Sequence, residues 1–227
     1  MRIDMSIQRY NGYGVRAFVL ILASFLPSTV HAFAHELGFS VEPTFLAFPA
    51  VAPSDSSAVG LQTRNSTVTL SPAAAFSLEY YPLNYLSVVV RGGYAFAVVD
   101  TLIGEATFDN RTGNYWFRQS MGFGLAGARI ETPHHWTPVT FGASLQAGFG
   151  LLVHTDAELR NAAGAKLRAN PPTGVIPVPM LALSGTISGR VSEQIRIGTE
   201  PTLFLLPTNP VRVGFGLSLS VAFFFFV

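Results

Sequence analysis

The chain has no cysteine, one lysine, and few charges of either sign. The missing thiols exclude a disulfide scaffold and any metal site built on cysteine. Charged residues make up 12% of the 227 residues, about half the share usual for a soluble domain. With a formal net charge of +1, the chain has no basic surplus that would favour nucleic acid as a partner.

Long apolar runs are also scarce, and the clearest one lies at the N-terminus. Residues 17–26 read AFVLILASFL and follow the basic residues Arg2, Arg9 and Arg16. This pattern is typical of a signal peptide, with cleavage predicted after Ala32 or Ala34. The alternative is an N-terminal anchor, but the run is shorter than the roughly 20 residues of a membrane-spanning helix. We therefore predict a signal peptide over 1–34 and one domain over 35–227.

The strongest pattern lies at the other terminus. From Val211 to Val227 every second residue is large and apolar, and most residues between them are glycine, serine or alanine. A period of two over this length predicts a strand with one apolar face and one face of small residues. Transmembrane β-barrels present such strands to lipid.

Seven further segments alternate in the same way. Together with the last one, they predict strands over 39–47, 68–80, 86–98, 115–130, 139–153, 178–191, 195–205 and 211–227. Most are near or above the 9–11 residues that a tilted transmembrane strand needs. The predicted fold is an all-β, eight-stranded antiparallel up-and-down transmembrane barrel.

The connections between these segments alternate in length. Short turns are predicted at 82–84, 131–137 and 192–194, long polar loops at 49–66, 100–114 and 154–176, and 207–210 is a short exception. Short periplasmic turns and longer outer loops are a barrel feature. Residues 156–168 are rich in alanine and leucine, and we expect a short helix in that loop.

Alternation alone would also suit a soluble lipocalin-like barrel or a β-sandwich. The small-residue face argues against both, because a soluble outer surface should be rich in charge. We therefore place that face inside the barrel. On 115–130 the same rule puts Tyr115, Phe117, Met121, Phe123 and Leu125 on the lipid side. The scattered polar residues of the inner faces are predicted to form a paired network: Glu42, Glu79, Arg91, Arg118, Gln146, Arg196 and Glu200.

Aromatic residues cluster near predicted strand ends, as expected for rings at the two membrane interfaces. The periplasmic set is Tyr80, Tyr81, Tyr85, Trp136 and residues 223–226, and the outer set is Phe45, Phe48, Tyr115, Trp116 and Phe204.

On these patterns the chain resembles the small eight-stranded outer-membrane proteins of Gram-negative bacteria, among them OmpX and the transmembrane domain of OmpA. The resemblance implies a place in the outer membrane, in contact with its lipid and lipopolysaccharide. It also implies assembly by periplasmic chaperones and the barrel-assembly machinery, which read a C-terminal signal. Phe223, Phe225 and Val227 occupy that signal here, with valine in the final position that is usually aromatic.

Chemical motifs are weak. Residues 122–127 match GxGxxG, but a dinucleotide site needs those glycines between a strand and a helix, and here they lie within a strand. His134 and His135 lie with Glu131 in a predicted turn and lack a third ligand at useful spacing. His154 opens a polar loop, but no serine nucleophile can be assigned a base. We therefore predict no catalytic residue, metal or cofactor.

The sequence thus predicts an integral outer-membrane barrel with a structural role or a role in surface contacts through its outer loops. A narrow pore or small-ligand conduit is the alternative, and a lipid-modifying enzyme comes third. The surface partner is not predicted.

Overall fold

The computed structural model describes residues 35–49, 51, 68–98, 100–133, 138–171, 173–208 and 211–226. The predicted signal peptide, Trp136 and Val227 lie outside these residues. The strands are β1 (Glu36–Pro49), β2 (Val68–Leu83), β3 (Leu86–Ala95), β4 (Asp100–Phe108), β5 (Arg111–Glu131), β6 (Val139–Arg160), β7 (Lys166–Leu167), β8 (Gly174–Arg190), β9 (Ile195–Leu206) and β10 (Arg212–Phe226). Across the described ranges, no helix has the length and apolar character needed to span a membrane.

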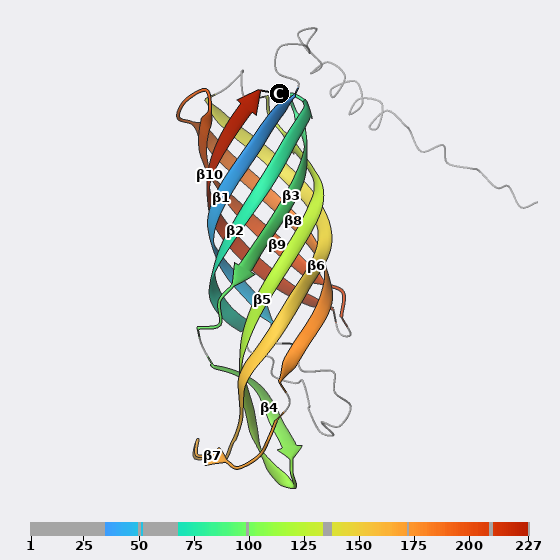
Figure 1. The fold of residues 1–227 in the computed structure, drawn as a ribbon, viewed down its shortest axis with the longest axis vertical. Helices are drawn as coiled ribbons and strands as arrows, with labels where there is room; N and C mark the ends of the chain where they lie inside the picture. The colour runs from blue at the N-terminus through green and yellow to red at the C-terminus, as the bar shows by residue number, and fades with distance from the viewer. Residues whose placement is uncertain are drawn as a thin grey trace, which may run out of the picture.

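Eight of these strands close into a barrel (Figure 1). Every pairing is antiparallel, and the ring runs β1, β2, β3, β5, β6, β8, β9, β10 before β10 returns to β1. Ring closure leaves no free edge in the part of the wall that these pairings cover, as a membrane requires. The predicted up-and-down barrel is confirmed.

The two ends of the barrel differ. The first residue of β1 pairs with the last residue of β10, Glu36 with Phe226, so both lie at one end, which we call the terminal end. The connections β2–β3, β5–β6 and β8–β9 turn there. The opposite end, the loop end, carries the remaining connections, as the alternation of loop lengths predicted.

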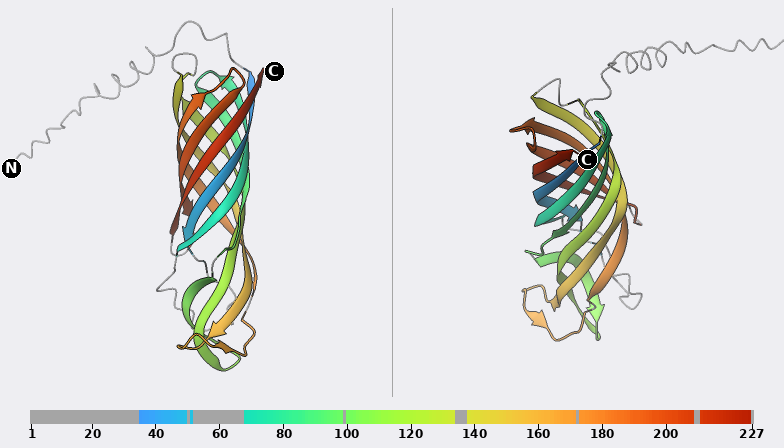
Figure 2. Two further views of the ribbon diagram at one scale, coloured as in Figure 1. Left: turned by 90° about the vertical axis from the view of Figure 1, so that its left-hand side faces the viewer. Right: turned by 45° about the horizontal axis from the view of Figure 1, so that its top comes forward.

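At the loop end, β5 and β6 run well beyond their neighbours and form an extension with β4 and β7 (Figures 1 and 2). The predicted loop 100–114 is instead a hairpin, in which β4 pairs with the start of β5. Asp109 and Asn110 turn it with φ angles of 49° and 60°. Two consecutive positive φ values are typical of a tight two-residue hairpin turn.

The expected helix over 156–168 is wrong. β6 continues to Arg160, which pairs with Asn114 of β5. The chain then reverses through Gly164, whose φ is +82°, and returns as β7. Helix propensity of the alanines is a weak preference, and pairing with the long β5 overrides it.

Large apolar side chains cover the outer surface of the barrel on seven of the eight strands. Phe149, Leu145 and Val90, for example, are 67%, 64% and 51% exposed. Buried residues alternate with them along each strand. The predicted faces of these seven strands are confirmed.

On β5 the predicted faces are wrong. Tyr115, Phe117, Met121, Phe123 and Leu125 all point inward and are at most 8% exposed. Gly122, Gly124, Ala126 and Ala128 therefore lie on the outer surface.

The reason for this reversal lies at the end of the same strand. Arg129 and Glu131 share the face of Leu125 and are also buried, whereas Ile130 between them is 64% exposed. Arg129 forms buried ion pairs with Glu79 and Glu200, and removing one partner from such a pair costs about 3–5 kcal/mol. Because side chains alternate strictly, turning these charges inward turns the large residues inward too.

Aromatic rings from β2 and β3 lie over two of the glycines on this outer surface. A Cβ at Gly92 would meet Phe76 Cζ at 3.0 Å, and one at Gly122 would meet Tyr94 Cδ2 at 3.7 Å. Tyr94 also donates a hydrogen bond of 2.9 Å to Ser120. The rings thus cover backbone that glycine leaves bare.

The predicted interface aromatics divide between the two sides of the wall. Phe45 and Tyr80 face outward, at 60% and 39% exposure. Phe48, Tyr81, Tyr115 and Phe204 are buried inside instead. The clustering at strand ends that was expected to form interface rings therefore fills the interior in part.

The face reversal on β5 can be tested with single cysteines, because the chain has none of its own. In lipid vesicles, a nitroxide attached to Ala126→Cys should be readily relaxed by oxygen, which dissolves in the bilayer. One attached to Leu125→Cys should be much less accessible. Greater oxygen accessibility at 125 than at 126 would restore the faces that the sequence predicted.

Candidate functional site: the interior of the barrel

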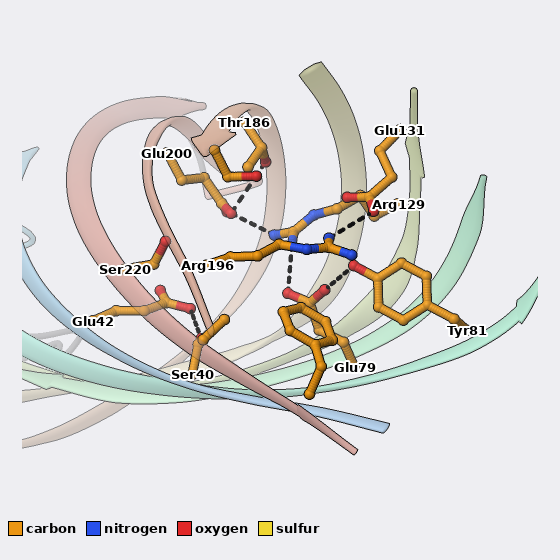
Figure 3. Close-up of a pocket in the computed structure, with 13 residues that line it drawn as sticks. Ser40, Glu42, Glu79, Tyr81, Arg129, Glu131, Thr186, Arg196, Glu200 and Ser220 are labelled. Atoms are coloured by element: carbon orange, nitrogen blue, oxygen red, sulfur yellow. Dashed lines mark hydrogen bonds and ion pairs between the residues drawn. The ribbon is translucent and has the colours of Figure 1, made fainter. Parts of the chain in front are cut away.

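The interior of the barrel has two layers. Towards the loop end it is apolar, with a cluster that includes Leu46, Met121, Leu152, Met180 and Phe204. Towards the terminal end it is polar and contains buried glutamates and arginines. These charges lie close together inside the wall (Figure 3).

Five residues form one continuous chain of ion pairs. Arg91 bridges Glu42 and Glu200, with contacts of 2.5 and 3.0 Å. Arg129 bridges Glu200 and Glu79. The order is therefore Glu42, Arg91, Glu200, Arg129, Glu79, with a carboxylate at both ends. We call this the five-residue chain.

The two terminal carboxylates of this chain accept hydrogen bonds from neutral hydroxyls. Ser40 donates to Glu42 over 2.8 Å, and Tyr81 donates to Glu79 over 2.7 Å. In the middle, Thr186 donates to Glu200 over 3.4 Å. The five-residue chain has three carboxylates and two arginines, and these hydroxyl groups supply further hydrogen bonds to the carboxylates. A buried charge network is stable only when its members have hydrogen-bond partners.

Three more residues form a second, shorter chain. Arg196 donates to Glu131 over 3.0 Å and lies 3.9 Å from Glu36. Its guanidinium also stands 4.1 Å from the ring centre of Phe224, a cation–π contact. Phe224 is buried, whereas its neighbours Phe223 and Phe225 are exposed on the outer surface.

Little space is left between the two chains. The cavity that they line, together with Ser220 and Thr186, has a volume of about 20 Å³. A cavity of this size holds about one water molecule. The described side chains therefore fill this layer, as expected for an eight-stranded barrel.

Comparison with solved structures agrees with this architecture. OprG, an outer-membrane protein of Pseudomonas aeruginosa, superposes with a TM-score of 0.52 and 10% identity, covering 86% of this chain and 97% of OprG. Neisserial surface protein A (NspA) gives 0.51 and 12%, covering 82% of this chain and 96% of NspA. Ail of Yersinia pestis gives 0.46 and 14%, covering 85% and 100%. No protein family model and no curated protein sequence matches the chain.

The chain has the eight-stranded barrel fold of OprG and NspA. The predicted resemblance to the OmpA and OmpX class is confirmed at the level of fold. At 10–12% identity the likeness is one of fold alone, so roles for particular residues come from this chain's own geometry.

Of the seven residues predicted for the inner network, five lie in the two chains: Glu42, Glu79, Arg91, Arg196 and Glu200. Gln146 is buried on the inner face of β6 and donates to Ser144 over 3.1 Å. Arg118 lies elsewhere. It occupies the outward face of β5 in the extension, is about half exposed, and pairs with Asp156 at 3.5 Å.

The prediction missed Arg129, Glu131 and Glu36. Arg129 and Glu131 were overlooked because the faces of β5 were assigned from residue size alone. The available signal was that Arg129 and Glu131 flank the apolar Ile130. Charged residues are costly on a face that meets lipid, so this end of the strand indicates that the odd-numbered residues point inward.

The weaker motifs hold no site in the described residues. The glycines of 122–127 lie in the middle of β5, so no helix follows them. Glu131 pairs with Arg196, while His134 and His135 lie outside the described residues. Within the ranges described, no three histidine, aspartate or glutamate side chains are grouped to hold a metal ion.

The ion-pair chains predict a large difference between two arginines of the same strand. Arg129→Met should destabilise the barrel by about 3–5 kcal/mol, because it leaves Glu79 and Glu200 buried without their shared partner. Arg118→Met should cost about 1 kcal/mol or less, since its ion pair is exposed. Urea unfolding in lipid vesicles, followed by tryptophan fluorescence, measures both. Equal losses would mean that Arg129 is not the centre of the network.

Proposed function

We propose that the chain is a bacterial outer-membrane barrel that anchors a surface module, the extension of β4 to β7, for contacts outside the cell. The terminal end would face the periplasm, because short turns and both strand termini lie there in such barrels. The loop end would face outward and carry the extension.

The observation that carries this proposal is that the extension has a core of its own. Phe108, Tyr115, Phe117 and Leu159 are buried together, apart from the apolar cluster of the barrel. Tyr115 and Phe117 stack with ring centres 5.4 Å apart. A loop that only linked two strands would need no such core, so this core indicates that the extension keeps a defined conformation.

The outer face of the extension is polar. Arg118, Asp156, Glu158, Arg160 and Lys166 border an open depression of about 390 Å³. The hydrogen bond from Lys166 lowers the pKa of the Glu158 carboxyl, with a further contribution from Arg160. A mixed-charge face beside a lipid surface suits contact with the phosphates of lipopolysaccharide, which we include in the proposal.

β4 also offers a free edge. It pairs with β5 on one side, and no described strand pairs with the other. By contrast, the part of β8 that extends past the end of β9 contains Pro177 and Pro179, which lack the N–H groups that invite pairing. The described backbone of β4 has no proline, so this edge can accept an extended segment of a protein partner.

The narrow pore predicted as an alternative gains no support from the interior. Two ion-pair chains fill one layer, and an apolar cluster fills the next. The reading as a lipid-modifying enzyme likewise has no set of catalytic residues behind it in the described part of the chain. We propose neither.

Assembly through the C-terminal signal remains part of the proposal. Phe223 and Phe225 face outward at the terminal end of β10, with exposures of 37% and 54%. Val227 lies outside the described residues. Outward aromatics at the periplasmic end are accessible to chaperones and the assembly machinery before insertion.

The orientation predicts which end can be reached on intact cells. A short epitope tag inserted in the turn at 161–164 should bind antibody on whole cells. The same tag inserted at 192–194, in the turn between β8 and β9, should bind only after the outer membrane is permeabilised. The reverse pattern would invert the topology, and binding at both sites without permeabilisation would argue against a membrane barrel.

The packed interior predicts that the protein does not conduct ions. Purified protein reconstituted in planar bilayers should show no steady conductance in salt solution, because the charged layer leaves room for about one water. Reproducible steady conductance would support the pore instead.

A further inference from the structure

One polar pair lies between the two apolar clusters of the interior. Gln119 of β5 and His154 of β6 are 0% and 2% exposed. Met121 and Leu152, in the barrel cluster, lie on one side of this pair along the strands, and Phe117, in the extension core, lies on the other. A buried polar pair between apolar layers costs free energy unless its hydrogen bonds are made.

Gln119 uses both ends of its amide to hold the chain that leaves β1. Its Oε1 accepts a hydrogen bond from the Val51 N–H at 3.0 Å, and its Nε2 donates to the Pro49 carbonyl at 3.3 Å. The last ladder pair between β1 and β2 joins Pro49 with Val68. Beyond that pair the side chain of Gln119 takes the place of a strand partner.

His154 in turn orients Gln119. Its Nε2 lies 3.0 Å from Gln119 Oε1. Because that oxygen is an acceptor, the Nε2 of His154 must carry the hydrogen. The imidazole packs edge-on against Phe117, with ring centres 4.4 Å apart. Its other nitrogen, Nδ1, is buried and has no hydrogen-bond partner in the described structure.

We propose that Gln119 and His154 form an acid-sensitive latch, which holds the backbone of Pro49 and Val51 at the boundary between the barrel cluster and the extension core. When His154 is neutral, its Nε2–H donates to Gln119 and its Nδ1 carries no hydrogen that needs an acceptor. Protonation would add an N–H at Nδ1, where the described residues supply no acceptor, and would place a charge between apolar layers.

The described groups that face the ring offer no compensating charge. Phe117 and Gln119 from β5, which contact the imidazole, are both uncharged. The nearest charges along these strands, Arg118 and Asp156, pair with each other in the extension. The latch is therefore closed at neutral pH and released as the pH falls.

Amide hydrogen exchange measured by NMR on the full barrel in lipid nanodiscs tests this proposal. The protection factor of the Val51 amide, corrected for intrinsic exchange, should fall by about tenfold between pH 7 and pH 4, the effect of losing one hydrogen bond. The amide of Val89, buried in β3, serves as the internal reference and should stay protected.

Two variants separate the latch from general packing. Gln119→Leu should leave Val51 unprotected at both pH values. His154→Gln keeps a donor for Gln119 but cannot titrate, so Val51 should be protected equally at both. The proposal is overturned if wild-type Val51 is equally protected at pH 4 and pH 7, if His154→Gln shows the wild-type loss, or if Val89 loses protection in parallel.

Discussion

The structure depends on keeping charge away from lipid. Arg129 is held between Glu79 and Glu200, and Arg91 extends the same chain to Glu42. Because these residues come from β1, β2, β3, β5 and β9, their pairing ties distant strands of the wall to one another. The cost of exposing any of these charges to hydrocarbon favours the observed facing of these five strands.

This constraint explains the unusual outer surface of β5. Glycines and alanines face lipid there, although large residues would bury more apolar area. Turning Arg129 outward would leave Glu79 and Glu200 buried without their shared partner, which costs about 3–5 kcal/mol, and every residue of the strand must turn with Arg129. Tyr94 of the neighbouring strand β3 then covers part of the bare backbone of β5 at Gly122.

The interior and the extension follow from the same reversal. The large residues of β5 that turn inward fill the barrel at Met121, Phe123 and Leu125, and they fill the extension at Tyr115 and Phe117. One continuous strand thus supplies both cores. The barrel is therefore packed and the extension keeps a defined shape of its own, which is why we propose surface contact and not conduction.

The sequence by itself determined the class of fold, the order of the eight barrel strands, the alternation of loop lengths and the facing of seven strands. These features depend on local periodicity, which each strand carries alone. Only the tertiary structure decided the facing of β5, the β4 hairpin, the strand in place of a helix after Asp156, and the partners of Arg129. These outcomes rest on contacts between strands far apart in the chain, and the alternation of residues within one strand does not specify which side chains will meet across a closed barrel.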